Sequence, residues 1–239
     1  MIIEAARLAG RDLFARETRS AFWRILGITL MLLIGGWIAV REVFVAYALP
    51  WLQHLLPGIP EWLAWIGIVL GFIAGLGMAA AFILLIAPVT AIVAGLFLDG
   101  LAETIESRDY PHDSPGKAIP VGQAILYTVK FLGVVIVGNL VALLLLLIPG
   151  VNIVAFFLVN GYLFGREFFE FAALRFRSED EVRQLRSKYA ATIFLAGLLI
   201  AVVLSIPVVN LLTPLFGALL MVHLHKMIAH RDPEFALPA

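Results

Sequence analysis

Three arginines stand just before and at the start of the first long apolar stretch of the chain: Arg16, Arg19 and Arg24. A helix that begins here leaves its first N–H groups without partners inside the helix. Such N–H groups and arginine side chains are the donors that an oxyanion needs. The same arginines would also suit cationic anchors at the headgroups of the cytoplasmic leaflet. The residue types alone leave both roles open.

The other polar side chains that could react lie near the C-terminus. His223, His225 and His230 include an H-x-H pair, but residues two apart on a helix face different directions and the chain has no cysteine. We therefore expect no metal site and no cofactor. Motifs of metallopeptidases, serine hydrolases and nucleotide-binding loops are missing from the sequence. Its long uncharged stretches also lack the acidic pairs of intramembrane proteases, so we do not expect an enzyme.

The composition defines the environment in which these residues act. Of the 239 residues, 62 % are hydrophobic and 14 % are charged, and the mean hydropathy is +1.00. Soluble domains have about 45–50 % apolar and about 25 % charged residues. The composition therefore predicts an integral membrane protein of the all-α class. The 17 basic and 17 acidic residues cancel, and no long basic run indicates nucleic acid as a partner.

Two stretches are long enough to cross a lipid bilayer. About 20 apolar residues cross a hydrocarbon core of roughly 30 Å, and residues 22–40 and 62–86 meet that length. Residues 1–21 place apolar side chains at helical spacing, with charged side chains mostly on the other side. This pattern predicts an amphipathic helix on the membrane surface. We expect two transmembrane helices preceded by one surface helix.

Small residues form a stripe on the second of these spans. Gly67, Gly71 and Gly75 recur every four residues, and Ala79 continues the row. Small residues let another helix approach closely, so the stripe predicts a helix-packing face. The packing partner is either the first span of the same chain or a second copy of the chain.

Two later stretches, residues 131–165 and 189–225, share one pattern. Each has an apolar leg, a break that contains proline and ends in asparagine, and a second apolar leg. The breaks read IPGVN at 148–152 and IPVVN at 206–210. Proline lacks an N–H group and clashes with the preceding turn, so a helix kinks or ends there. We predict two helical hairpins with these residues at their apices: Pro149, Gly150, Asn152, Pro207 and Asn210.

The length of the legs bears on how deeply these hairpins enter the bilayer. The leg Leu132–Ile148 has 17 residues, which is about 26 Å of helix and less than the hydrocarbon core. The apices carry no charge and no aromatic anchor, so we expect the hairpins to penetrate only partly. The two asparagines either satisfy backbone groups that the prolines leave unpaired or line a hydrated path.

Basic residues predict the orientation of the chain. With two spans and two returning hairpins, sixteen of the seventeen lysines and arginines fall on one side of the membrane. The far segment, 41–61, holds only Arg41. The positive-inside rule places the basic side in the cytoplasm. Both termini, including the tail at 226–239, are then cytoplasmic in a bacterial-type inner membrane.

The order of these motifs resembles the CysZ sulfate-permease family, which also includes the etoposide-induced 2.4 proteins. The similarity covers about residues 10–230 and rests on the two spans and the two proline apices. It also rests on Ala87-Pro88 with the later stretch LAETIE at 101–106, and on Leu211-Leu212-Thr213-Pro214 after the second apex. The resemblance implies a single membrane domain with two full-length helices and two hemi-penetrating hairpins. It further implies sulfate uptake for cysteine synthesis and a homo-oligomer, a dimer or larger.

The chain departs from this family at one place. Members with a recognisable anion site carry a turn like Gly-Leu-Asn-Pro, followed by adjacent arginines, just before the first span. This chain has ARETRS at residues 15–20, in which Arg19 matches one arginine position and Glu17 adds a negative charge.

Charged residues are missing from the depth of the spans, so pore-like flux is expected rather than proton coupling. The alternative is a non-transporting membrane protein whose hairpins shape the bilayer or recruit partners.

Overall fold

The structure, a computed structural model, describes residues 1–48, 50–51, 64–118 and 151–237. These residues form helices and no strand, so the all-α class is confirmed. Two helices are long and apolar enough to cross a membrane, Arg16–Tyr47 and Val209–Arg231. The first leg of the hairpin predicted at 131–165, together with Pro149 and Gly150, lies outside the described residues.

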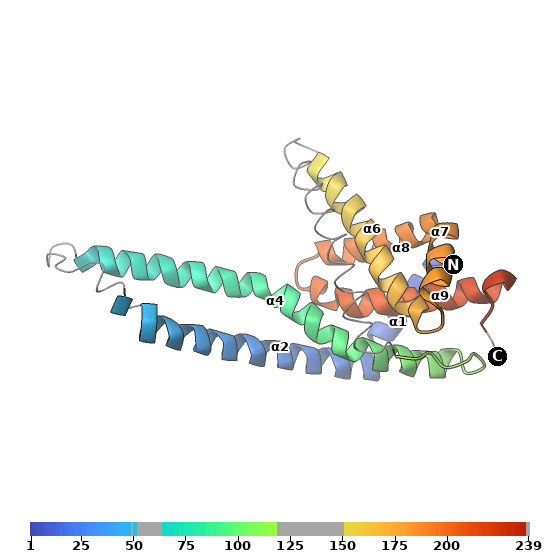
Figure 1. Cartoon of the computed structure of the whole chain (residues 1–239), viewed down its shortest axis with the longest axis horizontal. Helices are drawn as coiled ribbons and strands as arrows, with labels where there is room; N and C mark the ends of the chain where they lie inside the picture. The colour runs from blue at the N-terminus through green and yellow to red at the C-terminus, as the bar shows by residue number, and fades with distance from the viewer. Residues whose placement is uncertain (49, 52–63, 119–150, 238–239) are drawn as a thin grey trace. The chain divides into compact units, whose positions relative to one another are not determined.

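The chain divides into two compact units, Trp23–Val93 and Met1–Phe22 with Ala94–Ala239. The Trp23–Val93 unit contains most of α2 (Arg16–Val43), a π-helical end (Phe44–Ala48) and the first part of α4 (Ala64–Asp109) (Figure 1). In this unit the rings of Trp37 and Phe82 meet edge to face at 5.1 Å. Many large apolar side chains of α2 are exposed, as expected for a helix whose solvent is lipid.

Helix α4 is longer than the predicted span at 62–86. It is one helix of 46 residues that passes through Pro88 and ends at Asp109. Proline removes one hydrogen bond from the helix ladder, and membrane helices tolerate this loss when local adjustments satisfy the unpaired carbonyl group. Pro88 therefore lies inside the helix rather than at its end.

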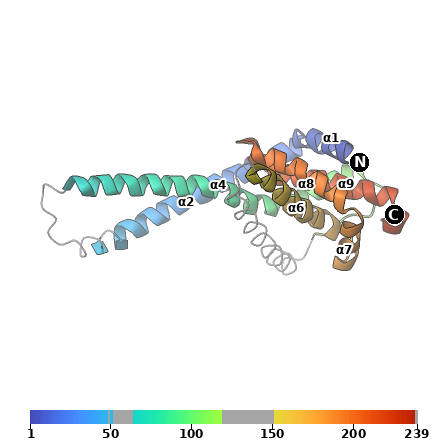
Figure 2. The same ribbon diagram turned by 90° about the horizontal axis from the view of Figure 1, so that it is seen from above.

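The other unit is built around its C-terminal helix. It contains α1 (Ile2–Leu13), α6 (Val151–Leu174), α7 (Glu179–Lys188), α8 (Ala190–Ser205) and α9 (Thr213–Arg231), with 3₁₀ turns at Val209–Leu212 and Pro233–Phe235. Nearly every side chain of α9 from Leu215 to Ala229 is buried. Helices α1, α6 and α8 all pack against α9, and Figures 1 and 2 both show α6, α8 and α9 side by side.

The segment 1–21, predicted as one amphipathic helix, forms two elements. α1 ends at Leu13 and α2 begins at Arg16, with a short break between them. The buried face of α1 consists of Ala5, Ala9 and Asp12. Ile3 and Phe14 are 85 % and 79 % exposed. The small face of α1 thus packs against α9, and these two large apolar side chains remain available to the surroundings.

Glycines bring α6 and α8 into backbone contact. A Cβ atom on Gly197 of α8 would overlap the carbonyl oxygen of Gly161 and lie 2.7 Å from the backbone nitrogen of Gly165. Because the obstacle is main chain, only glycine fits at this crossing. A Cβ atom on Gly75 would meet no atom within 4 Å. The packing role of Gly67, Gly71 and Gly75 remains a prediction.

The second proline apex contains an unusual turn between α8 and α9. Val208 has φ 68° and ψ −48°, and the N–H group of Val209 donates to the carbonyl of Pro207 at 2.8 Å. This is a γ-turn with a positive φ, which is rare and strained, particularly for a β-branched residue. The N–H group of Asn210 donates to the carbonyl of Ile206 at 2.9 Å. Main-chain bonds therefore close this apex among the described residues.

Candidate anion-binding site and its neighbouring ion pairs

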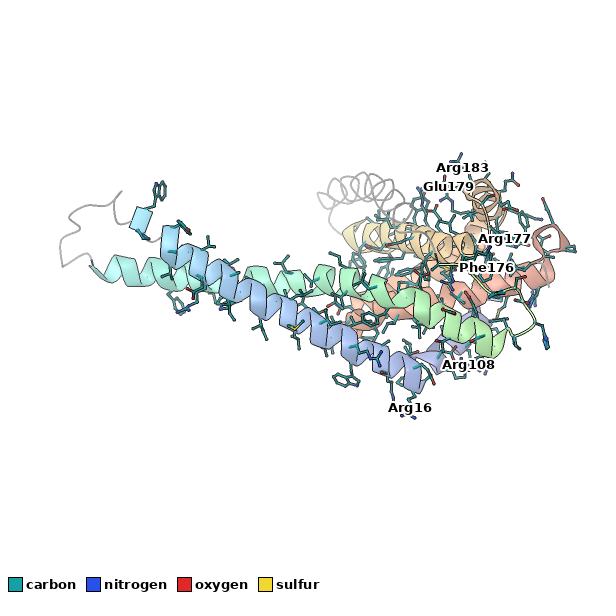
Figure 3. All side chains as sticks on the ribbon, turned by 60° about the horizontal axis from the view of Figure 1, so that its bottom comes forward. Arg16, Arg108, Phe176, Arg177, Glu179 and Arg183 are labelled. Carbon is teal, nitrogen blue, oxygen red and sulfur yellow. The ribbon has the colours of Figure 1, made fainter. Side chains whose placement is uncertain are left out.

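The three arginines singled out from the sequence all lie on α2 and are exposed. Arg16 and Arg19 stand in its first turn, where a spacing of three places side chains on the same side of a helix. Figure 3 shows Arg16 at the start of α2. Arg24 lies farther along the same helix. The structure shows no ion pair for these arginines among the residues that it describes, although Glu17 shares the first turn.

Directly before α2, the end of α1 contributes the centre of a polar network. Asp12 is 1 % exposed. Its Oδ1 atom lies 2.8 Å from Nε of Arg11 and 2.7 Å from Nη2 of Arg108, and its Oδ2 atom lies 2.9 Å from Nε2 of His223. These contacts join α1 to the end of α4 and to α9. The network therefore fixes the segment that leads into Arg16 and Arg19.

Two further groups complete this network. Asp109 pairs with Arg108 at 2.8 Å and also with Arg11. The hydroxyl of Tyr110 lies 2.9 Å from Nδ1 of His223. With a proton on Nε2, His223 donates to Asp12 and accepts a hydrogen bond from Tyr110. Burial and the charge of Asp109 raise the pKa of Tyr110, so its hydroxyl keeps the proton that it donates.

The ionisation of Asp12 follows from competing effects. Burial raises the pKa of this carboxyl group, but hydrogen bonds from Arg11 and His223 and the charge of Arg108 outweigh burial. The pKa of Asp12 therefore lies below its ordinary value, and the group is ionised at neutral pH. Two carboxylates then balance two guanidinium groups within the network.

Asp12, Asp109 and His223 bring ligand atoms within 4.8 Å of one another, a spacing that would fit a metal ion. Arg11 and Arg108 already pair with both carboxylates. A cation would have to displace both guanidinium groups and remove the proton from His223. We interpret the cluster as an ion-pair network that holds helices together.

The other two histidines have separate partners. Nε2 of His225 accepts a hydrogen bond from Arg177 at 3.3 Å, and Nε2 of His230 lies 2.9 Å from Asp113. His225 faces away from the other two, whereas His223 and His230, seven residues apart, lie on one face of α9, and both rings stand 5.8 Å from the ring of Tyr110. Their hydrogen-bond partners still differ. The three histidines form no common ligand set.

A second ion pair lies where α4 ends and α6 ends. Arg175, which is buried, donates from Nε and Nη2 to the carboxylate of Glu106 at 2.9 and 3.0 Å and also pairs with Asp99. A Cβ atom on Gly116 would lie 2.7 Å from Oε2 of Glu106 and 3.1 Å from Nε of Arg175. The loop after α4 therefore closes directly over this pair, and the position of Gly116 leaves no room for a side chain.

Sequence reasoning identified Glu106 only as part of a motif and assigned it no role. Its partner is 69 residues away in the sequence. Glu106 follows Pro88 as part of that motif, but no periodic pattern in the sequence links it to Arg175.

The residues predicted at the two hairpin apices lie in different kinds of element. Pro207 and Asn210 lie in the turn between α8 and α9, whereas Asn152 lies in the first turn of α6.

These features define the class of the protein: an all-helical membrane protein with charged networks packed around α9. Residues 6–214 match the model of one protein family, Sulfate transporter CysZ/Etoposide-induced protein 2.4. The chain belongs to this family, and the resemblance noted in its motifs is confirmed. No curated protein matches the chain significantly.

Proposed function

We propose that this protein is a permease for sulfate or a related oxyanion that supplies sulfur assimilation from a bacterial inner membrane. The observation that carries this proposal is membership of the sulfate transporter family across residues 6–214. The helices Arg16–Tyr47 and Val209–Arg231, which are long enough to cross a membrane, agree with that role.

We place the first contact of the anion at Arg16 and Arg19. Both side chains are exposed and stand in the first turn of α2, whose N–H groups add positive potential. Glu17 offsets one of the two charges and leaves an excess of one positive charge. Arg24 would extend this cationic surface along the same helix.

Flux through the protein is channel-like in this proposal. The long uncharged stretches of the sequence carry no carboxylate that could couple transport to protons. The pathway would be bordered by more than one copy of the chain, in a dimer or larger homo-oligomer. Open space beside Gly75 is compatible with a second copy on that face.

The test is influx of radiolabelled sulfate into proteoliposomes that contain the wild type, an Arg16→Gln/Arg19→Gln double variant or Arg41→Gln. Arg41 is an exposed arginine that pairs at 2.9 Å with its neighbour Glu42, and it serves as the matched control. We expect saturable influx, with the half-saturating sulfate concentration raised about tenfold in the double variant because charge-assisted hydrogen bonds are lost. Arg41→Gln should match the wild type.

Other outcomes would redirect the proposal. Influx no higher than into empty liposomes would sink it and favour a membrane protein whose hairpins shape the bilayer or recruit partners. Influx that requires an imposed proton gradient would exclude a channel-like pathway. Equal influx in all three proteins would remove Arg16 and Arg19 from the site.

A further inference from the structure

A cavity of about 330 Å³ opens between α6, α7 and α8. It is lined by Tyr162, Arg166, Arg183, Arg186, Ser187, Ala190, Ile193 and Phe194. Ligand pockets in proteins typically measure about 300–1,000 Å³, so this cavity has room for a small polar group. Three of its eight lining residues are arginines, which is an unusual concentration of positive charge for a cavity in an apolar chain.

The arginines of this cavity are not balanced by acidic residues. Arg166 lies 3.0 Å from Oε1 of Glu170, and Arg186 pairs with the same oxygen atom. The side chains of Arg166 and Arg186 are only 21 % and 26 % exposed. Arg183 is exposed, and Glu179, one turn earlier on α7, does not line the cavity (Figure 3).

Three arginines therefore line the cavity, and the carboxylate of Glu170 pairs with two of them, Arg166 and Arg186. These two share one carboxylate in a partly buried position, and Arg183 adds a third, exposed guanidinium group. Such an excess of positive charge at partly buried arginines is unfavourable unless an anion joins it. The planar fork of arginine matches the oxygen atoms of phosphate and sulfate groups. A doubly charged tetrahedral oxyanion would balance this charge.

The start of α8 adds positive potential to the same cavity. Helices α7 and α8 meet at an angle of 88°, and Ala190, the first residue of α8, lines the cavity. No side-chain hydrogen bond caps this N-terminus, and the hydroxyl of the N-cap residue, Tyr189, donates to Asp232 at 2.8 Å. The first N–H groups of a 16-residue helix thus begin at the cavity wall.

The surroundings change from charged to apolar across the cavity. Ile193 and Phe194 form one wall. Exposed apolar side chains continue along both neighbouring helices, with Leu195 and Leu199 on α8 and Leu158 on α6. A cationic pocket at one end of exposed apolar helices is the arrangement expected where lipid headgroups meet hydrocarbon.

We propose that this cavity is a binding site for a tetrahedral oxyanion group, a phosphate or a sulfate, held by Arg166, Arg183 and Arg186. The hydroxyl groups of Ser187 and Tyr162 are further donors at the wall. The group is carried either by an anionic phospholipid or by a free inorganic anion. This site is separate in the sequence from Arg16 and Arg19, and it does not depend on transport.

The test compares Arg183→Gln with Arg231→Gln, a control that removes an exposed arginine on the last turn of α9, outside the cavity. One arm measures binding of radiolabelled sulfate and phosphate to the full chain in neutral detergent by equilibrium dialysis. This arm uses the Arg16→Gln/Arg19→Gln background, so that the proposed uptake site does not contribute. The other arm uses native mass spectrometry of protein from phosphatidylcholine nanodiscs that contain phosphatidylglycerol, and counts the retained phosphatidylglycerol.

In at least one arm, we expect Arg183→Gln to lower the affinity or the retention about tenfold, and Arg231→Gln to leave it unchanged. A loss confined to the nanodisc arm identifies a lipid phosphate, and a loss confined to dialysis identifies a free anion. Equal losses in Arg183→Gln and Arg231→Gln would overturn the proposal. It would also be overturned if the protein with all three cavity arginines retained no anion in either arm. Because neither arm measures flux, failure of the permease proposal would leave this result standing.

Discussion

At the scale of single residues, two acidic groups on α1 illustrate how burial changes the value of an ion pair. Asp12 is buried among Arg11, Arg108 and His223, whereas Glu4 pairs with Arg7 at 2.5 Å with both side chains at least half exposed. Removing a partner from a buried hydrogen-bonded group leaves other groups unsatisfied, but exposed pairs contribute little. The two carboxylates should therefore respond differently to the same change.

We predict that Asp12→Asn lowers the free energy of unfolding by about 1–3 kcal/mol, because His223 and two arginines lose a charged partner. Glu4→Gln should leave it almost unchanged, because its pair with Arg7 is exposed to solvent. Thermal unfolding of the purified variants in one detergent measures both. Equal destabilisation would show that the network around Asp12 adds no more than a surface pair.

The depressed pKa of Asp12 gives a second prediction, on the effect of acid. A carboxyl group with a lowered pKa in the folded state stabilises above its ordinary pKa of about 3.9, and this contribution is lost as pH falls through the folded value. The stability difference between wild type and Asp12→Asn should be constant from about pH 7 to 5 and should shrink below about pH 4. Thermal scans across this range would check it, and a difference that does not shrink below pH 4 would contradict it.

The turn at Val208 gives a third prediction. Its positive φ strains a β-branched residue, and the corresponding position of the first apex is Gly150. Val208 is 80 % exposed, so its side chain contributes little burial. Val208→Gly should raise the free energy of unfolding by about 1 kcal/mol, since relief of strain exceeds the entropy cost of glycine.

Val209→Gly is the matched control for this turn. Val209 begins the 3₁₀ helix Val209–Leu212 and its φ is not positive, so glycine there should only cost stability. Thermal unfolding of the two variants in the same detergent gives the comparison. If both variants are destabilised alike, the turn at Val208 is not strained.

At the scale of elements, the crossing of α6 and α8 depends on glycine. We predict that Gly197→Ala lowers the free energy of unfolding by about 1–3 kcal/mol, because its Cβ atom would meet the backbone of Gly161 and Gly165. Gly75→Ala is the control, since a Cβ atom there meets no atom within 4 Å. Unfolding measurements in detergent should separate the two variants, and tolerance of alanine at position 197 would mean that the helices can move apart at little cost.

Sequence patterns predicted the helical elements better than their contacts. The apolar stretches and proline breaks indicated where helices run, but proline did not end α4, and the segment 1–21 divided before Arg16. The spacing Gly161-x-x-x-Gly165 was visible in the sequence and resembled the stripe on the second span. Its partner Gly197 stands alone on another helix, and a single glycine carries no periodic signal.

At the scale of the whole molecule, the distribution of basic residues predicts one orientation in the membrane. The chain has no cysteine, so single cysteines can report the side on which each segment lies. Gln184→Cys on α7 should react with an impermeant maleimide only after cells are permeabilised, and Tyr47→Cys should react in intact cells. Both sites are exposed. The opposite pattern of labelling would reverse the topology.

Composition and motif order predicted the membrane class and the family, because both depend on local sequence. The polar networks depend on long-range partners. Asp12 and His223 are 211 residues apart, and Glu106 and Arg175 are 69 residues apart. Tertiary packing brings such groups together, and no period in the chain links them. The arginines around the α6–α7–α8 cavity were visible as charge, but the fold was needed to show that they share one space.

The backbone contact between α6 and α8 has a mechanical consequence. With Gly161, Gly165 and Gly197 in main-chain contact, the two helices cannot slide or rotate past one another without steric overlap. The two helices are therefore expected to move as one rigid body. A displacement of one helix carries the other with it, so that α6 and α8 are expected to shift together in any rearrangement of this unit.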